Sequence, residues 1–196
     1  MGERDSLLQS SFHTRSLDQV YHDLETSLDG LSTAQAKKRR NLYGLNNVPS
    51  PVNAPAWLCC LLPCLLRTKE MLIYNDSVPE HAIVKRNGKW INMDSASLVP
   101  GDIVKIDTHE RIPADIRLIE VDNCIFSTNA VYNSNSNLIA SITTSSDKYV
   151  GASNMGFLGY LVESGSCVGV VVATGKNAVI SKLIKGRLWP PKTSDN

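Results

Sequence analysis

The 196-residue sequence predicts an α+β chain, in which a mainly β domain follows a helical segment at the N-terminus. Three observations support this prediction. Apolar residues recur at helical spacing near the N-terminus, an Asn-Gly pair separates two short alternating runs after residue 80, and Val-rich runs with glycines follow residue 154. Helices that precede a group of strands, and do not alternate with them, are typical of α+β folds.

The helical segment is expected to contain two helices. Ser16 and Gln19 have the spacing of a capping box, and apolar residues follow them at helical intervals, so the first helix should begin here and end at Gly30. A second helix should run over 32–42 and close at Gly44. Residues 46–53 are rich in Asn, Pro and Ser and predict a linker.

The β domain begins with the clearest local signal in the chain. Residues 82–93 form two short runs around Asn87-Gly88, the dipeptide that favours a tight hairpin. The other elements are expected in this order: a strand over 98–106 with a type II turn at Pro100-Gly101, a strand over 111–119, a loop over 127–147, two buried strands over 155–174 and a short helix over 177–185.

These elements divide the chain into five expected parts, which are a flexible N-terminus (1–11), a helical segment (12–50), an apolar Cys-rich linker (51–79), a β domain (80–186) and a flexible tail (187–196). The net charge of +1 provides no basic field for nucleic acid. No apolar run reaches the roughly 18–20 residues of a spanning helix. The N-terminus lacks the apolar region of a secretory signal, so secretion is not expected.

The five cysteines favour a reducing compartment over a disulfide framework, because their number is odd and three of them cluster. The cluster lies in the apolar stretch 54–66, where cysteines are candidates for S-acylation. Gly2 begins a myristoylation pattern, and the basic run 37–40 could strengthen an attachment to anionic lipid, although such a run is usually a solvated helix face. The lipidation candidates are therefore Gly2, Cys59, Cys60 and Cys64. The alternative is that residues 54–66 pack on the protein's own core.

No metal or cofactor site is predicted. The histidines have no metal-ligand spacing, and no histidine lies near Cys60 and Cys64 to complete a zinc site; the histidines are His13, His22, His81 and His109. The glycines of the Val-rich region do not follow a strand-to-helix turn, as a dinucleotide site would require; they are Gly165, Gly169 and Gly175.

Several motifs resemble one family. LVPGDIV (98–104), RIPAD (111–115) and SCVGVVVATGKN (166–177) are similar to the actuator domain of P-type cation-transporting ATPases, and residues 13–49 resemble the helical segment that precedes it. The resemblance implies a distorted, jelly-roll-like β domain. It also implies that Pro100-Gly101-Asp102 and Pro113-Ala114-Asp115 mainly shape turns.

The sequence departs from the family at the catalytic loop. The family's T-G-E-S motif, whose glutamate positions water to hydrolyse an aspartyl phosphate, aligns with Tyr132, Asn133, Ser134 and Asn135. A serine hydroxyl is a poor general base, and such a base contributes about 10²–10⁴-fold to a rate. The phosphorylated D-K-T-G motif does not occur in these residues, so no catalytic residue is predicted.

The expectation is a non-catalytic binding or regulatory module with a protein partner, of which a cation-pump subunit is the first candidate. It would act in the cytoplasm or on the cytoplasmic side of a membrane, at whose surface it would be held, and without nucleic acid, cofactor or small-molecule substrate. The alternative is a truncated product of a cation-transporting ATPase that acts only with the rest of a pump. An enzyme active by itself is the third and least favoured hypothesis.

Overall fold

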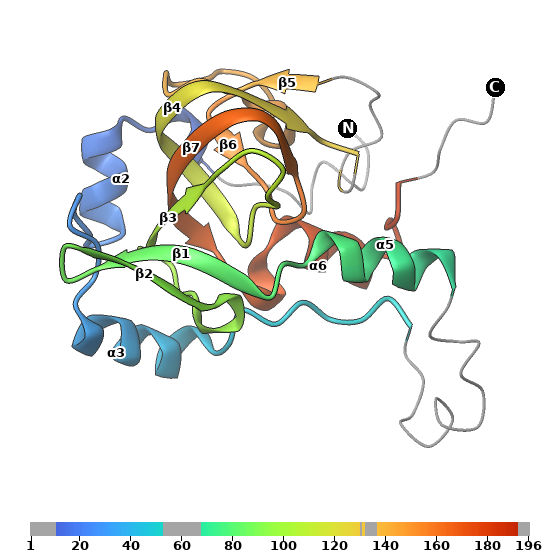
Figure 1. The fold of residues 1–196 in the computed structure, drawn as a ribbon, viewed down its shortest axis with the longest axis horizontal. Coiled ribbons are helices and arrows are strands. Elements are labelled where there is room, and N and C mark those ends of the chain that lie inside the picture. The colour runs from blue at the N-terminus through green and yellow to red at the C-terminus, as the bar shows by residue number, and fades with distance from the viewer. Residues whose placement is uncertain (1–10, 53–67, 130, 132–136, 192–196) are drawn as a thin grey trace.

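The structure is a computed structural model, and it describes residues 11–52, 68–129, 131 and 137–191 (Figure 1). Within these ranges the strands join one antiparallel sheet of order β2-β1-β3-β7-β4-β5, with β6 paired to β4. The strands are β1 (His81–Arg86), β2 (Lys89–Asp94), β3 (Ile103–Ile106), β4 (Asp115–Ser127), β5 (Asn137–Ile139), β6 (Met155–Gly156) and β7 (Leu161–Ala173). The α+β class is confirmed.

The helices lie around the sheet, α2 and α3 at one end and α5 and α6 along the opposite side (Figure 1). Their bounds are α2 (Leu17–Asp23), α3 (Thr33–Tyr43), α5 (Lys69–Ser77) and α6 (Val179–Lys185). Single 3₁₀ turns occur at Phe12–Thr14, Ser95–Ser97, Tyr149–Gly151 and Gly175–Asn177. No helix in the described ranges is both long and apolar enough to span a membrane.

The two predicted helices of the N-terminal segment are present, and each begins with a capping box. Ser16 pairs with Gln19, and Ser32 pairs with Gln35. The predicted end of the first helix was wrong. The helix α2 stops at Asp23, because Glu25 adopts a positive φ of 42° that a helix cannot continue through.

The 51–79 region holds a helix that the sequence pattern did not predict. Thr68 caps α5 by accepting a hydrogen bond from the Met71 amide. The helix buries Met71, and the Tyr74 hydroxyl donates to the carbonyl of Val48 at 2.7 Å. The helix is therefore held against the described end of the N-terminal segment.

The β strands differ from the predictions in length more than in place. The hairpin β1–β2 lies where Asn87-Gly88 predicted it. The 98–106 run is a strand only from Ile103, since its first half is a turn. The strand predicted over 111–119 begins at Asp115 and continues to Ser127, and the predicted loop over 127–147 contains β5.

The long strands β4 and β7 form the centre of the domain, and their inner faces supply much of the core. Four of its largest wholly buried side chains are Phe126, Met155, Phe157 and Tyr160. The Val-rich composition of β7 reflects this position, because β-branched residues suit a strand packed into a core. The core thus holds β4 firmly up to the point where the 128–136 connection leaves it.

Candidate functional site

The connection between β4 and β5 corresponds in position to the catalytic loop that the resemblance indicates. Ser127 pairs with Asn137 and Ile125 with Ile139, so the two ends of this connection are neighbours in the sheet. Val131 within it is fully buried. The predicted loop residues lie outside the described residues; they are Tyr132, Asn133, Ser134 and Asn135. The lipidation candidates Gly2, Cys59, Cys60 and Cys64 lie outside them too.

The LVPGD motif forms the turn that leads into β3. Gly101 has a φ of +94°, as the predicted type II turn requires at this position. A Cβ atom there would lie 2.3 Å from Nη1 of Arg39, so a larger residue would also displace that side chain. The Gly101 amide donates to the Val171 carbonyl at 2.8 Å, and the Val171 amide donates to the Asp102 carbonyl at 2.8 Å. These bonds fix the turn against β7.

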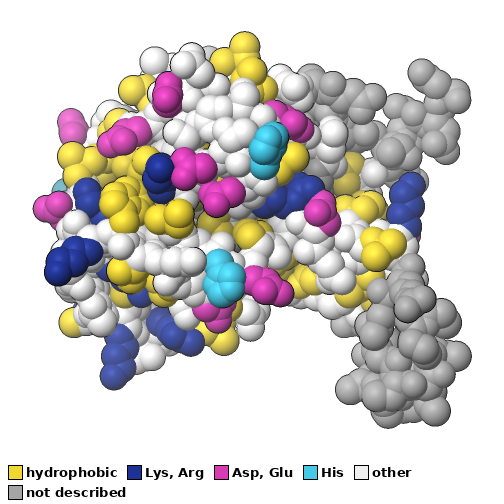
Figure 2. Space-filling view, in the orientation of Figure 1, with side chains coloured by type: hydrophobic (Ala, Val, Ile, Leu, Met, Phe, Trp, Pro, Cys, Tyr) yellow, Lys and Arg dark blue, Asp and Glu magenta, His cyan; other side chains and the backbone are white. Residues whose placement is uncertain are grey.

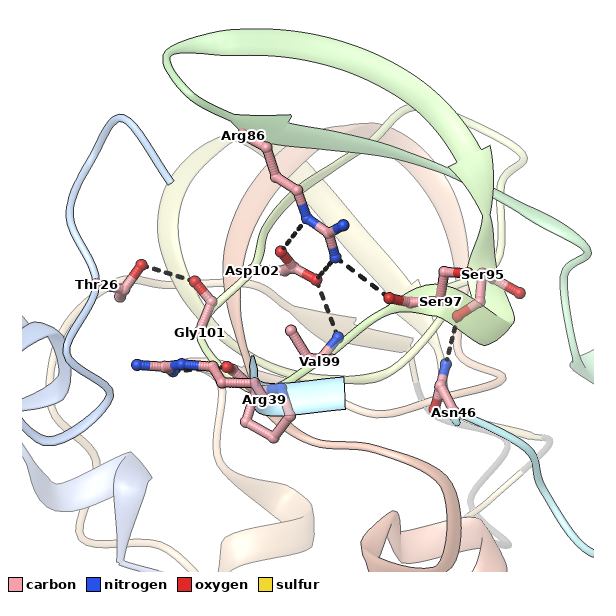
Figure 3. Close-up of polar contacts among 10 residues, drawn as sticks. Thr26, Arg39, Asn46, Arg86, Ser95, Ser97, Val99, Gly101 and Asp102 are labelled. Carbon is pink, nitrogen blue, oxygen red and sulfur yellow. Dashed lines mark hydrogen bonds and ion pairs between the residues drawn. The ribbon is translucent and has the colours of Figure 1, made fainter. Parts of the chain in front are cut away.

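Asp102 is the charged centre of this turn. Its side chain is 0% exposed and accepts hydrogen bonds from Arg86 Nε at 2.8 Å and Nη2 at 2.6 Å (Figure 3). The Val99 amide donates a third bond at 2.9 Å. A bidentate arginine is the geometry in which a buried carboxylate is best compensated. The pair therefore ties the end of β1 to the turn before β3.

The N-terminal segment docks on this same turn. Arg39 of α3 donates from Nη1 to the Pro100 carbonyl at 2.7 Å, and the Thr26 hydroxyl donates to the Gly101 carbonyl at 2.7 Å (Figure 3). Only 12% of the Arg39 side chain is exposed. The expectation of a wholly solvated basic run was thus wrong at this residue, because its guanidinium satisfies turn carbonyls that face α3. The other members of the run are exposed, and Lys and Arg side chains gather at the lower left of Figure 2, over α3 and the hairpin.

Asn46 makes a second and more deeply buried contact between the N-terminal segment and the β domain. Its amide nitrogen donates to the carbonyls of Ser95 at 3.0 Å and Pro113 at 2.9 Å, and its Oδ1 accepts from the Gly175 amide at 2.8 Å. The residue is 4% exposed. One side chain thus joins the N-terminal segment to three separate loops of the β domain. We refer to the contacts of Thr26, Arg39, Asn46, Arg86 and Asp102 as the joint.

The RIPAD motif has a comparable structural role at the start of β4, the end away from the β4–β5 connection. The Asp115 carboxylate accepts hydrogen bonds from the amides of Leu158 at 3.1 Å and Val179 at 2.7 Å, and so joins the loop before β7 to the start of α6. Complete burial raises the pKa of Asp115 to about 7, against the opposing effects of these two amides and of Lys182. This carboxyl changes charge near neutral pH.

The remaining sequence candidates are dispersed. His13 is buried and packs against the Tyr149 ring at 5.5 Å, whereas the other histidines are exposed. The part of the chain that the structure describes holds no group of three or more His, Cys, Asp or Glu side chains suited to a metal ion. The glycines singled out in the Val-rich region lie where a side chain would collide with a neighbour; they are Gly165, Gly169 and Gly175.

Sequence reasoning missed the residues that make the joint. Arg86 lies in no motif, and Arg39 and Asn46 lie in the segment 13–49 that carries the resemblance, which assigns them no contact. One signal was available, because Asp102 stands in an otherwise apolar run, and a charge in such a run needs a partner of opposite charge. The geometry that results positions the N-terminal segment rigidly on the β domain.

Comparison with known families finds two matching regions in the chain. The family model described as "P-type ATPase actuator domain" matches residues 76–186. A second, described as "Cation transporter/ATPase, N-terminus", matches residues 12–62. The joint thus connects the two matched regions.

Individual relatives are similar over half of this chain or more. A calcium-transporting ATPase of Bacillus subtilis is 37% identical over 106 residues, which cover 53% of this chain and 12% of that protein. Calcium-transporting ATPase 1 of Bacillus cereus is 38% identical over 109 residues, 52% of this chain and 12% of its own. A putative cation-transporting ATPase of Methanocaldococcus jannaschii is 26% identical over 211 aligned positions, 86% of this chain and 25% of its own. The chain therefore spans between about an eighth and a quarter of these relatives.

Proposed function

This chain belongs to the P-type ATPase family, and from that premise we propose that it is a non-catalytic member that binds and regulates a protein partner. The observation that carries the proposal is the contrast between the joint and the loop. The joint is well formed, because each side-chain oxygen and nitrogen of Asp102 and Asn46 takes part in a hydrogen bond. The loop has Ser134 where the family's resemblance calls for a glutamate.

The chemistry of the loop supports a role in binding. A glutamate at that position would accept a proton from the attacking water, whereas a serine hydroxyl has no basicity at neutral pH with which to do so. The strands at the two ends of the loop, β4 and β5, are paired in the sheet, so the ends of the loop are held as neighbours. A loop with fixed ends that lacks its base is suited to contact a partner without catalysing hydrolysis.

The first candidate partner is an intact cation pump, on the cytoplasmic side of a membrane. The chain carries the two regions that the family models match, so it could occupy contacts that a pump makes with its own actuator domain. Crosslinking in cells, followed by capture of the tagged full-length chain, tests this. We expect a pump subunit to be recovered with the wild type and with Lys38→Ala. Its absence from all crosslinked captures would contradict the proposal.

Arg39→Ala provides the matched comparison. Arg39 and Lys38 are adjacent basic residues on α3, but only Arg39 reaches the turn. If the joint positions the binding surface, Arg39→Ala should lower the recovery of the partner while Lys38→Ala leaves it unchanged.

The lack of catalysis has its own test. Purified protein is incubated with acetyl phosphate, an acyl phosphate like the family's intermediate, beside the Ser134→Ala variant. We expect no difference between the two. Hydrolysis by the wild type that the variant loses would overturn the non-catalytic assignment.

A second candidate function is supported by the order of the two matched regions, because residues 12–62 and residues 76–186 match in succession along the chain. We propose as the alternative a truncated product of a cation-transporting ATPase that works only with the rest of a pump. Co-expression with a pump lacking its actuator domain discriminates the two. Restored transport with the wild-type chain would favour the alternative. Restored transport only with Ser134→Glu would show that the wild-type loop lacks the catalytic group, and would favour the non-catalytic member.

Attachment to the membrane surface is the last part of the proposal. Gly2 and the cysteines at 59, 60 and 64 are the candidate lipidation sites, and two lipid signals together anchor a protein where one does not. Fractionation of the wild type, Gly2→Ala and the triple Cys→Ser variant measures this. Identical solubility of all three would remove lipidation from the proposal.

A further inference from the structure

The sheet ends at β2, a strand with one open edge. This strand pairs with β1 and with no other strand in the described part of the chain. Five of its six residues are exposed, and they include Trp90 and Ile91, each 43% exposed. The hairpin of β1 and β2 lies below β4 and β7 in Figure 1. An open edge of this kind is a template on which a further strand can pair.

The hydrogen bonds of the hairpin show which backbone groups of β2 face outward. Just beyond the two strands, the Ser95 amide donates to the Glu80 carbonyl. Residues of an antiparallel strand bond to a given neighbour alternately, so the odd-numbered residues of β2 bond to β1. The even-numbered residues direct their amides and carbonyls toward the open edge; they are Trp90, Asn92 and Asp94.

Charge is divided along this edge. The turn end of the hairpin carries Lys85 and Lys89, whereas the other end carries Glu80 and Asp94. Lys and Arg side chains also gather over α3 beside the turn end, at the lower left of Figure 2. A second copy that pairs antiparallel reverses the order of the ends, so each basic end meets an acidic one. The edge is therefore complementary to itself in charge.

We propose that β2 is an interaction surface for a second copy of this chain, which pairs with it antiparallel about a two-fold axis at Asn92. The outward-facing residues set this register, because they must bond to one another and because only this centre uses all three. Asn92 then lies opposite its own copy, and Trp90 lies opposite Asp94 of the second copy.

The side chains on the core face fit this register. Ile91 lies opposite Val84 of β1, which is fully buried, and Met93 packs partly against the same core. In the proposed pairing, Ile91 of each copy lies opposite Met93 of the other. The pairing would therefore extend the apolar face of the hairpin across the two copies.

The side chains on the outer face fit it too. Lys85 Nζ lies over the Trp90 ring, 5.7 Å from its centroid. Since Asp94 of the second copy lies directly beyond Trp90, this ammonium group is directed toward a carboxylate. Each copy supplies one such lysine and one such aspartate, so the contact occurs twice.

The strand lacks the features that usually protect an edge, which are proline, a bulge and a charge in the middle of the strand. The register of β1 and β2 is continuous, and residues 90–93 contain neither proline nor a charged side chain. The self-pairing does not depend on what the β4–β5 connection contacts. It can therefore hold or fail separately from the proposed function.

Sedimentation equilibrium of the full chain measures the association. Between about 5 and 500 µM, a range suited to a small interface, we expect the mass to rise from 21.5 kDa toward twice that value. Lys85→Glu should weaken the association by about tenfold or more, because it sets two like charges together. Lys105→Glu is the control, since Lys105 lies on the same face but on β3, away from the edge. A wild type that stays monomeric, or two variants that associate equally, contradicts the proposal.

Cysteine crosslinking tests the register, with the three cysteines of residues 59–64 replaced by serine. Hydrogen-bonded antiparallel partners have Cα atoms about 5.5 Å apart, which a disulfide can bridge. Asn92→Cys should therefore give a covalent dimer with oxidised glutathione. Lys89→Cys, which is exposed on the same strand, should not, because it lies opposite Ser95 of the second copy. Circular dichroism confirms that each variant is folded, and equal crosslinking of the two folded variants would count against this register.

Discussion

Replacing Asn46 by alanine should destabilise the protein far more than its place in a linker suggests. The substitution removes three buried hydrogen bonds, two donated by the side-chain amide and one accepted by Oδ1. At about 1 kcal/mol of net stability per bond, the expected loss is about 3 kcal/mol.

The groups left behind decide whether the loss is larger. The Ser95 carbonyl keeps a hydrogen bond from the Leu98 amide, so it stays paired. The Gly175 amide loses the side-chain oxygen that accepts its proton, and the Pro113 carbonyl loses its bond from the amide. A buried group left unsatisfied costs about 1–3 kcal/mol, so a total near 5 kcal/mol is expected where water does not enter. That is a large part of the about 5–15 kcal/mol by which a domain is usually stable.

The adjacent Asn47 is the control. It is an exposed asparagine one position along the same segment, so Asn47→Ala should change the free energy of unfolding by less than about 0.5 kcal/mol. Urea unfolding followed by circular dichroism measures both variants. Hydrogen exchange of the α3 amides adds a local reading, which should rise in Asn46→Ala alone. Equal stabilities of the two variants would refute the idea that Asn46 joins the segment to the β domain.

Three further perturbations have defined outcomes. Asp102→Asn should lower the free energy of unfolding in urea by about 3–5 kcal/mol, because it leaves the Arg86 charge buried without a partner. The double variant Arg86→Leu, Asp102→Leu should recover part of that loss. An unchanged stability of Asp102→Asn would contradict the pairing. Arg39→Ala should lower stability by about 2 kcal/mol and speed tryptic cleavage within 15–40, with Lys38→Ala unchanged; equal cleavage rates would oppose docking through Arg39. The folded pKa of Asp115, about 7, exceeds its ordinary 3.8, so its contribution is fully present below about pH 4 and is lost as pH rises to about 7. Between about pH 5 and pH 7.5 the wild type should lose about 3 kcal/mol in urea unfolding relative to Asp115→Asn, and parallel pH profiles would contradict the assignment.

Local patterns predicted the local structure well. The capping pair Ser16 and Gln19 and the turn pair Asn87-Gly88 act through neighbours in sequence, and each produced the element expected of it. The same logic missed α5, because a nine-residue helix beside a Pro-interrupted apolar stretch has too few turns for a distinct period. It shortened β4, because the polar residues after Ile119 face solvent on a strand that is bent by bulges.

The joint could not be predicted in the same way. Asn46 and Gly175 are 129 positions apart, and no spacing rule connects them. Arg39 was expected to be solvated because nothing local distinguishes it from Lys38, and only the docked position of α3 does so. The family resemblance located the turn motifs correctly but gave no partners for their buried charges.

The joint also limits what the motifs can say about function. Asp102 and Asp115 are fully buried and hydrogen-bonded to groups of the fold, and Gly101 is required by the backbone and by Arg39. A chain that folds in this way needs these residues whether or not it hydrolyses anything, because an unpaired buried charge or a crowded turn would destabilise it. The motifs that carry the resemblance therefore identify the scaffold, and they do not indicate whether the chain is catalytic. The loop at 132–135 is the part of the family pattern that bears directly on hydrolysis. A binding module is therefore distinguished from a pump fragment by the acetyl phosphate assay, by partner capture and by the Ser134 variants.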